Sequence, residues 1–126
     1  MRTRIQNATI VNEGKRFVGT VTLEDDKILS IIPSTEQAKA LPPTDRVIDA
    51  EGLYLIPGVI DDHVHFRDPG LTHKADMATE TAAAAAGGVT SFMDMPNCNP
   101  QTTTIEALEN KFADAATKCV VNYSFY

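Results

Sequence analysis

Residues 75–94 (ADMATETAAAAAGGVTSFMD) join a helix-like stretch directly to a strand-like stretch. The part over residues 75–86 is rich in alanine and other strong helix formers and contains no proline, so it predicts a helix. Gly87 and Gly88 predict its end, because glycine accepts the left-handed backbone that closes a helix. Val89–Asp94 is rich in β-branched and aromatic side chains, which is typical of a strand.

The segments on either side continue this alternation of strands and helices. Val59–Asp61 is a short apolar run of the kind found in buried strands, and Cys119–Phe125 predicts a further strand. Thr103–Glu106 fits a capping box with Thr103 as N-cap, and therefore predicts the start of a second helix. The residues expected on one face of that helix are Ile105, Leu108, Phe112 and Ala115. Residues 57–126 are thus predicted as a βαβαβ segment with a parallel sheet.

The first part of the chain has the composition of a β-rich domain. Five short stretches alternate or cluster apolar residues, and tight polar turns between the first three are typical of an antiparallel meander. These stretches are Arg4–Val11, Phe17–Leu23, Ile28–Ile32, Val47–Ala50 and Leu53–Ile56. Residues 33–45 are polar and contain three prolines, which predicts a loop with at most a short helical turn. We therefore expect a small, sandwich-like β domain over residues 1–56.

Charge and composition exclude several classes of function. The 126 residues carry 11 basic and 17 acidic side chains, a net charge of −6, and this balance argues against a nucleic-acid partner. No apolar run approaches the roughly 20 residues of a membrane span, and the N-terminus lacks the apolar core of a signal peptide. The two cysteines, Cys98 and Cys119, are expected to be free. We expect a cytoplasmic protein that acts on small molecules.

The residues richest in chemistry lie at positions 61–67 (DDHVHFR). His63 and His65 are two residues apart at the end of a predicted strand, so both imidazoles project from the same face. Two such histidines can share one zinc ion, and Asp61 on that face is a further ligand or a hydrogen-bond partner. The alternative is a pair of ordinary surface histidines. His73, in a predicted loop, is expected to lie on the surface.

Two further residues are suited to binding a substrate. Arg67 presents a planar guanidinium that can hold a carboxylate through two parallel hydrogen bonds. Asn97 follows the second parallel strand and can offer an amide to a carboxylate or carbonyl. The alternatives are a solvated arginine and a turn asparagine that bonds the local backbone. Asp94, at the end of the same strand, is expected to be a capping carboxylate.

Taken together, these motifs resemble a known family. Residues 57–70 (PGVIDDHVHFRDPG) resemble the opening barrel segment of the dihydroorotases, which belong to the cyclic amidohydrolase superfamily. The resemblance continues, in order, through residues 74–76 (KAD), 82–90 (AAAAAGGVT) and 94–97 (DMPN). It implies an α/β fold in which residues 57–126 begin a (β/α)8 barrel and residues 1–56 belong to the family's small β domain. A complete barrel needs about 250 residues, so we expect the barrel to be incomplete in these 126.

The resemblance also implies an activity and a set of site residues. The activity is the reversible hydrolysis of the ring amide of dihydroorotate to N-carbamoyl-L-aspartate in pyrimidine biosynthesis. His63 and His65 match the zinc-binding pair, Arg67 and Asn97 match the residues that hold the substrate carboxylate, and Asp61 has a supporting role. The implied cofactor is Zn²⁺, two ions in the complete enzyme, which lowers the pKa of water toward about 7 and polarises the amide carbonyl.

The same resemblance limits what these residues can do alone. The family's other zinc ligands and its catalytic aspartate lie on later strands, so no catalytic residue is expected here and the 126 residues are expected to be inactive. We expect the complete enzyme to be a homo-oligomer. One alternative is another cyclic amidohydrolase, an allantoinase or a hydantoinase (dihydropyrimidinase), although these families differ at the positions of Arg67 and Asn97. The other is a non-catalytic dihydroorotase-like subunit that serves in assembly.

Overall fold

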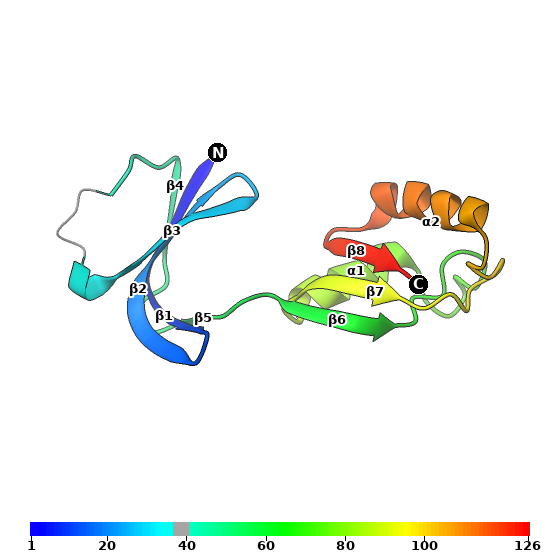
Figure 1. Ribbon diagram of the computed structural model, residues 1–126, viewed down its shortest axis with the longest axis horizontal. Helices are drawn as coiled ribbons and strands as arrows, with labels where there is room; N and C mark the ends of the chain where they lie inside the picture. Colours follow the sequence, from blue (N-terminus) through cyan, green and yellow to red (C-terminus); the bar gives the residue numbers. More distant parts are fainter. Residues whose placement is uncertain (37–40) are drawn as a thin grey trace. The chain divides into compact units, whose positions relative to one another are not determined.

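The chain divides into two compact units in the computed structural model, which describes residues 1–36 and 41–126. The first unit is Met1–Pro57 and the second is Gly58–Tyr126 (Figure 1). The division lies one residue after the predicted boundary between residues 56 and 57. The described residues of the first unit form mainly strands, and the second unit alternates strands with helices. The protein is therefore of mixed α/β class, as the sequence predicts.

The first unit contains the predicted antiparallel meander. Its strands are β1 (Arg2–Asn12), β2 (Lys15–Glu24), β3 (Lys27–Pro33), β4 (Arg46–Asp49) and β5 (Tyr54–Leu55). Strands β1, β2 and β3 are joined in antiparallel order, while β4 and β5 pair in parallel with β1. All five belong to one hydrogen-bonded sheet rather than to the two stacked sheets that a sandwich requires.

An irregularity in β1 explains how it pairs with two different strands. The register between β1 and β2 shifts between Ile5 and Ala8, where Asn7 has a positive φ of 62°. Strand β4 pairs before this irregularity and β5 pairs after it. A 3-10 turn at Ser34–Glu36 lies in the predicted loop over residues 33–45, whose residues 37–40 are outside the described residues.

The second unit has the predicted βαβαβ order. Its elements are β6 (Val59–Val64), α1 (Met77–Ala86), β7 (Val89–Asp94), α2 (Ile105–Lys118) and β8 (Asn122–Phe125). The three strands are parallel in the order β6-β7-β8, so their carboxyl ends meet at one edge of the sheet (Figure 1). Side chains from strands, helices and a loop form one buried cluster, namely Phe66, Met77, Phe92, Ala115 and Phe125.

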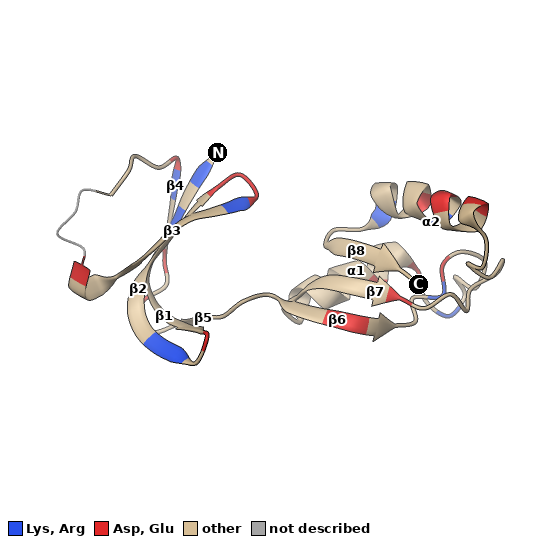
Figure 2. Ribbon diagram, viewed as in Figure 1, with Lys and Arg blue, Asp and Glu red and all other residues tan. Residues whose placement is uncertain are grey.

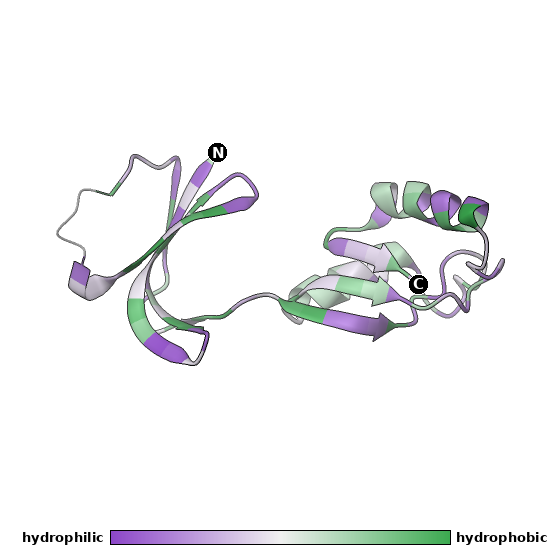
Figure 3. Ribbon diagram, viewed as in Figure 1, coloured by the Kyte–Doolittle hydropathy of each residue, from purple (hydrophilic) through white to green (hydrophobic). Residues whose placement is uncertain are grey.

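The apolar residues of strand β6 are more exposed than the sequence predicts. Val59 and Ile60 are predicted to be buried, yet they are 47% and 69% exposed. In the described part of this unit β6 is an edge strand that pairs only with β7, so nothing covers its other edge. The strand begins hydrophobic and becomes hydrophilic toward its carboxyl end (Figure 3). That polar end carries the candidate site residues.

Helix α1 begins and ends as the sequence indicates. Asp76 is its N-cap and accepts a hydrogen bond of 3.0 Å from the Thr79 amide, which lowers the pKa of the Asp76 carboxyl. Gly88 follows the helix with a φ of +87°, the left-handed conformation expected of a terminating glycine. Within residues 1–36 and 41–126, no helix combines the length and apolarity needed to cross a membrane.

Helix α2 begins one residue later than predicted. Thr104, not Thr103, is the N-cap, and its hydroxyl accepts a hydrogen bond of 3.1 Å from the Ala107 amide. The Thr103 amide is instead bonded to the Gln101 carbonyl, within the turn that precedes the helix. Glu106 thus stands one position too early for a capping box, which requires an acidic residue three positions after the cap.

The buried face of α2 matches the predicted one in part, because Ala115 is buried and Leu108 packs against the core cluster, whereas Phe112 is 39% exposed. Ile105 is 77% exposed, whereas Lys111 and Ala115 are fully buried. The predicted strand over residues 119–125 is shortened to β8, because Cys119 serves as the C-cap of α2. Helix α2 therefore directs the side chain of Lys111 toward the protein interior.

The two threonines allow a direct test of where α2 begins. Replacing Thr104 by Ala removes the cap and is expected to lower the free energy of unfolding by about 1 kcal/mol. Thr103→Ala is the matched control and should change it little, because the Thr103 side chain is exposed and outside the helix. Urea denaturation of both variants is the measurement. A larger loss for Thr103→Ala would contradict the assigned helix start.

Candidate active site

The candidate site lies where β6 and β7 end. The Met95 amide donates to the Val64 carbonyl at 3.0 Å, and the Tyr126 amide donates to the Asp94 carbonyl at 3.2 Å. These bonds bring the carboxyl ends of the three strands level with one another. Acidic residues occupy the later part of β6 and the end of β7 (Figure 2). Edges of this kind are where parallel sheets place their functional loops.

His63 and His65 lie together at the end of β6. Both side chains are exposed, and their ring centroids are 5.2 Å apart at an interplanar angle of 64°. Two imidazoles that bind one tetrahedral zinc ion have centroids about 5 Å apart, given Zn–N bonds of about 2.0–2.1 Å. The ring spacing is thus that of two ligands of one metal ion, and the metal-binding role of the pair stays a prediction.

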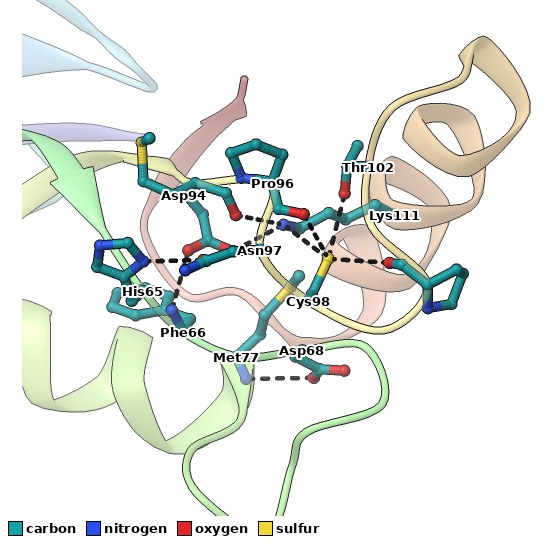
Figure 4. Close-up of polar contacts among 12 residues, drawn as sticks. His65, Phe66, Asp68, Met77, Asp94, Pro96, Asn97, Cys98, Thr102 and Lys111 are labelled. Atoms are coloured by element: carbon teal, nitrogen blue, oxygen red, sulfur yellow. Dashed lines mark hydrogen bonds and ion pairs between the residues drawn. The ribbon is translucent and has the colours of Figure 1, made fainter.

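Asn97 connects the loop after β7 to this pair. The His65 Nδ1 and Asn97 Oδ1 atoms are 2.9 Å apart (Figure 4). In the tautomer that carries its proton on Nδ1, His65 donates to this oxygen and keeps the lone pair of Nε2 for a metal. The Asn97 amide nitrogen keeps its two donors for another acceptor. Asn97 thus orients a histidine and still has hydrogen-bonding capacity for a substrate.

The remaining predicted residues lie near the pair but contact it differently. Asp61 Oδ1 accepts a hydrogen bond of 3.2 Å from the His63 amide, so the carboxylate supports the backbone rather than the imidazole. Arg67 is half-buried and has a positive φ of 65°, and its carbonyl accepts from the Leu71 amide. In the described residues Asn97 bonds His65 and not Arg67. His73 is exposed, as expected.

The two histidines would by themselves form only part of a catalytic zinc site. A catalytic zinc ion has three protein ligands as a rule. Across residues 1–36 and 41–126, no group of three or more histidine, cysteine, aspartate or glutamate side chains is placed to hold a metal. These residues can therefore contribute two imidazole ligands to a metal centre, and a third must come from elsewhere.

A buried ion pair beside the histidines is absent from the sequence-based prediction. Asp94 Oδ2 and Lys111 Nζ are 2.7 Å apart, and their side chains are 1% and 0% exposed. The other carboxylate oxygen of Asp94 accepts a hydrogen bond of 2.9 Å from the Phe66 amide (Figure 4). Asp94 therefore accepts a backbone amide from the loop after β6, as a capping carboxylate would, and its ion-pair partner is Lys111. The sequence pattern that could have predicted a buried Lys111 is the helical spacing of Leu108, Lys111, Ala115 and Lys118.

A second lysine of α2 reaches the loop after β6. Lys118 Nζ lies 2.9 Å from Asp68 Oδ2 and 2.7 Å from Asp114 Oδ2. The hydrogen bond to Asp114, with that to Asp68, raises the pKa of Lys118. The same Asp68 oxygen accepts a bond of 3.3 Å from the Met77 amide at the start of α1. Asp68 is 2% exposed and joins the loop to both helices.

Both cysteines are free, as expected. Cys98 is buried, and its Sγ contacts the Pro96 and Pro100 carbonyls and the Thr102 hydroxyl (Figure 4). Burial, with the nearby charge of Asp68, raises the pKa of the Cys119 thiol to about 11. A thiol with so high a pKa is a poor nucleophile at neutral pH, so Cys119 has no sign of a catalytic role.

The loops after β6 and β7 pack closely against each other. The Asn99 amide donates to the Pro69 carbonyl at 2.9 Å. Gly70 has a φ of +80°, and a Cβ atom there would meet the Asn99 carbonyl oxygen at only 1.8 Å. Glycine is therefore required at this position by both conformation and space.

The dihydro-orotase-like family model matches residues 52–125. The chain belongs to this dihydroorotase-like family. It is 42% identical to a dihydroorotase of Streptococcus pyogenes serotype M1 over 107 residues, which are 85% of this chain and 24% of that protein. It is 36% identical to a dihydroorotase of Lactobacillus gasseri over 126 residues, which are 100% of this chain and 28% of that protein. This dihydroorotase-like chain spans about a quarter of the length of these relatives.

Solved structures place the dihydroorotase-like chain among the cyclic amidohydrolases. An L-hydantoinase (dihydropyrimidinase) from Arthrobacter aurescens matches with a TM-score of 0.87 and 29% identity, over 98% of this chain and 27% of that one. A D-hydantoinase matches with a TM-score of 0.80 and 34% identity, over 99% of this chain and 26% of that one. The backbone is thus shared with hydantoinases, while the curated dihydroorotases are similar in sequence.

The close packing at Gly70 predicts a strong effect of a single methyl group. Gly88→Ala adds a side chain at a similar positive φ in open space and should cost about 1–2 kcal/mol. Gly70→Ala should lower the free energy of unfolding by clearly more, because the methyl group also collides with backbone at Asn99. Urea denaturation compares the two variants. Equal losses would show that the two loops do not pack as described.

Proposed function

We propose that this chain forms the N-terminal part of a zinc-dependent dihydroorotase, with its second unit as the start of a (β/α)8 barrel. The enzyme would catalyse the reversible hydrolysis of dihydroorotate to N-carbamoyl-L-aspartate in pyrimidine biosynthesis. The observation that carries the proposal is the combination of His63 and His65 with Asn97 and Arg67 at the carboxyl ends of two parallel strands and in the loops that follow them. Two zinc ions, a cytoplasmic location and a homo-oligomeric state stay predictions.

The two histidines would hold zinc in this proposal. The 5.2 Å between their rings and the donor set of two imidazoles both suit the ion. When bound, zinc supplies Lewis acidity that polarises a carbonyl and makes water more acidic. With the proton on His65 Nδ1, the contact with Asn97 would fix the ring and leave the lone pair of Nε2 to bind the metal.

Arg67 and Asn97 would hold the carboxylate of the substrate. The guanidinium offers two parallel donors, and the Asn97 amide nitrogen offers further donors while its oxygen stays on His65. A carboxylate held at two points fixes the orientation of the ring relative to the histidine pair, which lowers the entropic cost of reaction. Dihydroorotate and its product both carry this carboxylate, and so the clamp serves both directions of the reaction.

A hydantoinase (dihydropyrimidinase) is the second candidate, because the solved structures that match are hydantoinases with TM-scores up to 0.87. A shared backbone does not decide between the two, since related reactions use one scaffold and differ in the side chains of the site. The presence of both carboxylate-binding residues favours dihydroorotase.

The decisive assay uses the complete protein expressed from the gene that encodes these residues. It is expected to form dihydroorotate from N-carbamoyl-aspartate and to contain zinc, measured in parallel by elemental analysis. Hydantoin and dihydrouracil, which lack the ring carboxylate, serve as competing substrates. Preference for either of these would favour a hydantoinase. A metal-free, inactive protein would favour a non-catalytic assembly subunit.

Substitutions in the complete protein separate metal binding from substrate binding. Arg67→Ala should raise the KM for N-carbamoyl-aspartate by about 10- to 100-fold, the value of a charged hydrogen bond, while zinc stays bound. His63→Ala should lose zinc and activity together. His73→Ala is the matched histidine control and should change neither, because His73 is exposed outside the site. An unchanged KM in Arg67→Ala would refute the carboxylate clamp.

A further inference from the structure

Arg67 stands between two residues that are held in place. On one side, the Phe66 amide donates to Asp94 Oδ1 at 2.9 Å. On the other side, Asp68 Oδ2 lies 2.9 Å from Lys118 Nζ and accepts from the Met77 amide at 3.3 Å. Arg67 itself has a φ of +65°. A side chain in this left-handed region is strained and persists only where the surroundings fix the backbone.

Both attachments lead to helix α2. Lys111 pairs with Asp94 at 2.7 Å and Lys118 pairs with Asp68 at 2.9 Å. The two lysines are seven residues apart, which is about two helical turns, and therefore share one face of α2. The carboxylates they hold are 1% and 2% exposed, so water cannot replace the lysines as partners. Each buried carboxylate is thus tied to the helix by its own ammonium group.

Lys111 also contacts the loop that carries Asn97. Its Nζ lies 3.5 Å from the Met95 carbonyl and 3.8 Å from Cys98 Sγ (Figure 4). Met95 lies two residues before Asn97 in the chain, and Cys98 follows it directly. The Lys111 ammonium group therefore contacts the loop of Asn97 directly. It is also connected through Asp94 to Phe66, the residue before Arg67. Both halves of the proposed clamp are connected to the same point on the helix.

We propose that Lys111 and Lys118 are positioning residues, and that helix α2 places Arg67 for substrate binding through the Lys111–Asp94–Phe66 and Lys118–Asp68 contacts. This inference rests on the proposed function, because it takes the carboxylate role of Arg67 as given. Neither lysine touches the histidine pair. Lys118 reaches only the Asp68 side of Arg67, so its loss should affect substrate binding and leave the metal in place, whereas loss of Lys111 also releases the loop of Asn97, which contacts His65.

The test uses the complete protein with variants chosen to remain folded. Lys118→Met removes a lysine whose side chain is 31% exposed. The double variant Asp94→Leu with Lys111→Met removes both buried charges together, which avoids a single unpaired charge, and also removes the acceptor of the Phe66 amide. Both are expected to raise the KM for N-carbamoyl-aspartate at least fivefold, and in Lys118→Met the zinc content should be unchanged and kcat should stay within about twofold. Lys118→Arg should restore the KM, because it keeps a cation beside Asp68.

Asp114→Asn is the matched control. It removes the charge of the other partner of Lys118 and leaves the contact with Asp68, so the KM should stay within twofold of the wild-type value. A KM that is unchanged in both Lys118→Met and the double variant would overturn the inference. So would an equal rise in KM for Asp114→Asn, because the effect would then not depend on Asp68.

Hydrogen exchange separates this inference from the proposed function. In peptides that cover residues 62–80, the double variant should speed exchange at the Phe66 amide, and Lys118→Met should speed it at the Met77 amide, each at least tenfold. Unchanged exchange in both variants would refute the attachments themselves. A wild-type protein with no dihydroorotase activity would refute the proposed function, whatever the exchange rates show.

Discussion

The second unit depends on one buried pair of opposite charges, Asp94 and Lys111. Their side chains are 1% and 0% exposed and 2.7 Å apart. Charges so fully removed from water are tolerated only when paired, and removal of one partner of such a pair costs about 3–5 kcal/mol. The pair lies where β7 ends, and it joins three segments: the strand itself, helix α2 and, through the Phe66 amide, the loop after β6.

The aromatic core and the candidate site meet at Phe66. Its ring is buried and lies 4.6 Å from the ring of Phe92, while its amide is held by Asp94. Its neighbours His65 and Arg67 are at least partly accessible. One residue thus ties the polar end of β6 to the hydrophobic cluster under it. The residues of the candidate site are therefore attached to a well-packed hydrophobic cluster, and a precise arrangement of ligands and donors requires such rigid support.

The chain resembles hydantoinases in backbone structure and dihydroorotases in sequence. Hydantoinase structures match the backbone with TM-scores of 0.87 and 0.80, whereas dihydroorotases match the sequence at 42% and 36% identity. A histidine pair at the end of a strand serves any hydrolysis that needs a metal ion. In the proposed enzyme the choice of substrate would depend on side chains beside that pair, and Asn97 lies next to it because its side-chain oxygen contacts His65.

The sequence by itself determined the order of elements in the second unit, the end of α1 at its glycine pair and the common face of His63 and His65. All three follow from local propensity or from the two-residue period of a strand. Both depend only on residues that are close in the sequence. Only the tertiary structure decided that Lys111 is buried, that Asn97 bonds His65 and that Val59 and Ile60 are exposed. These features depend on partners distant in sequence, since burial and pairing are set by what packs against a residue rather than by its neighbours in the chain.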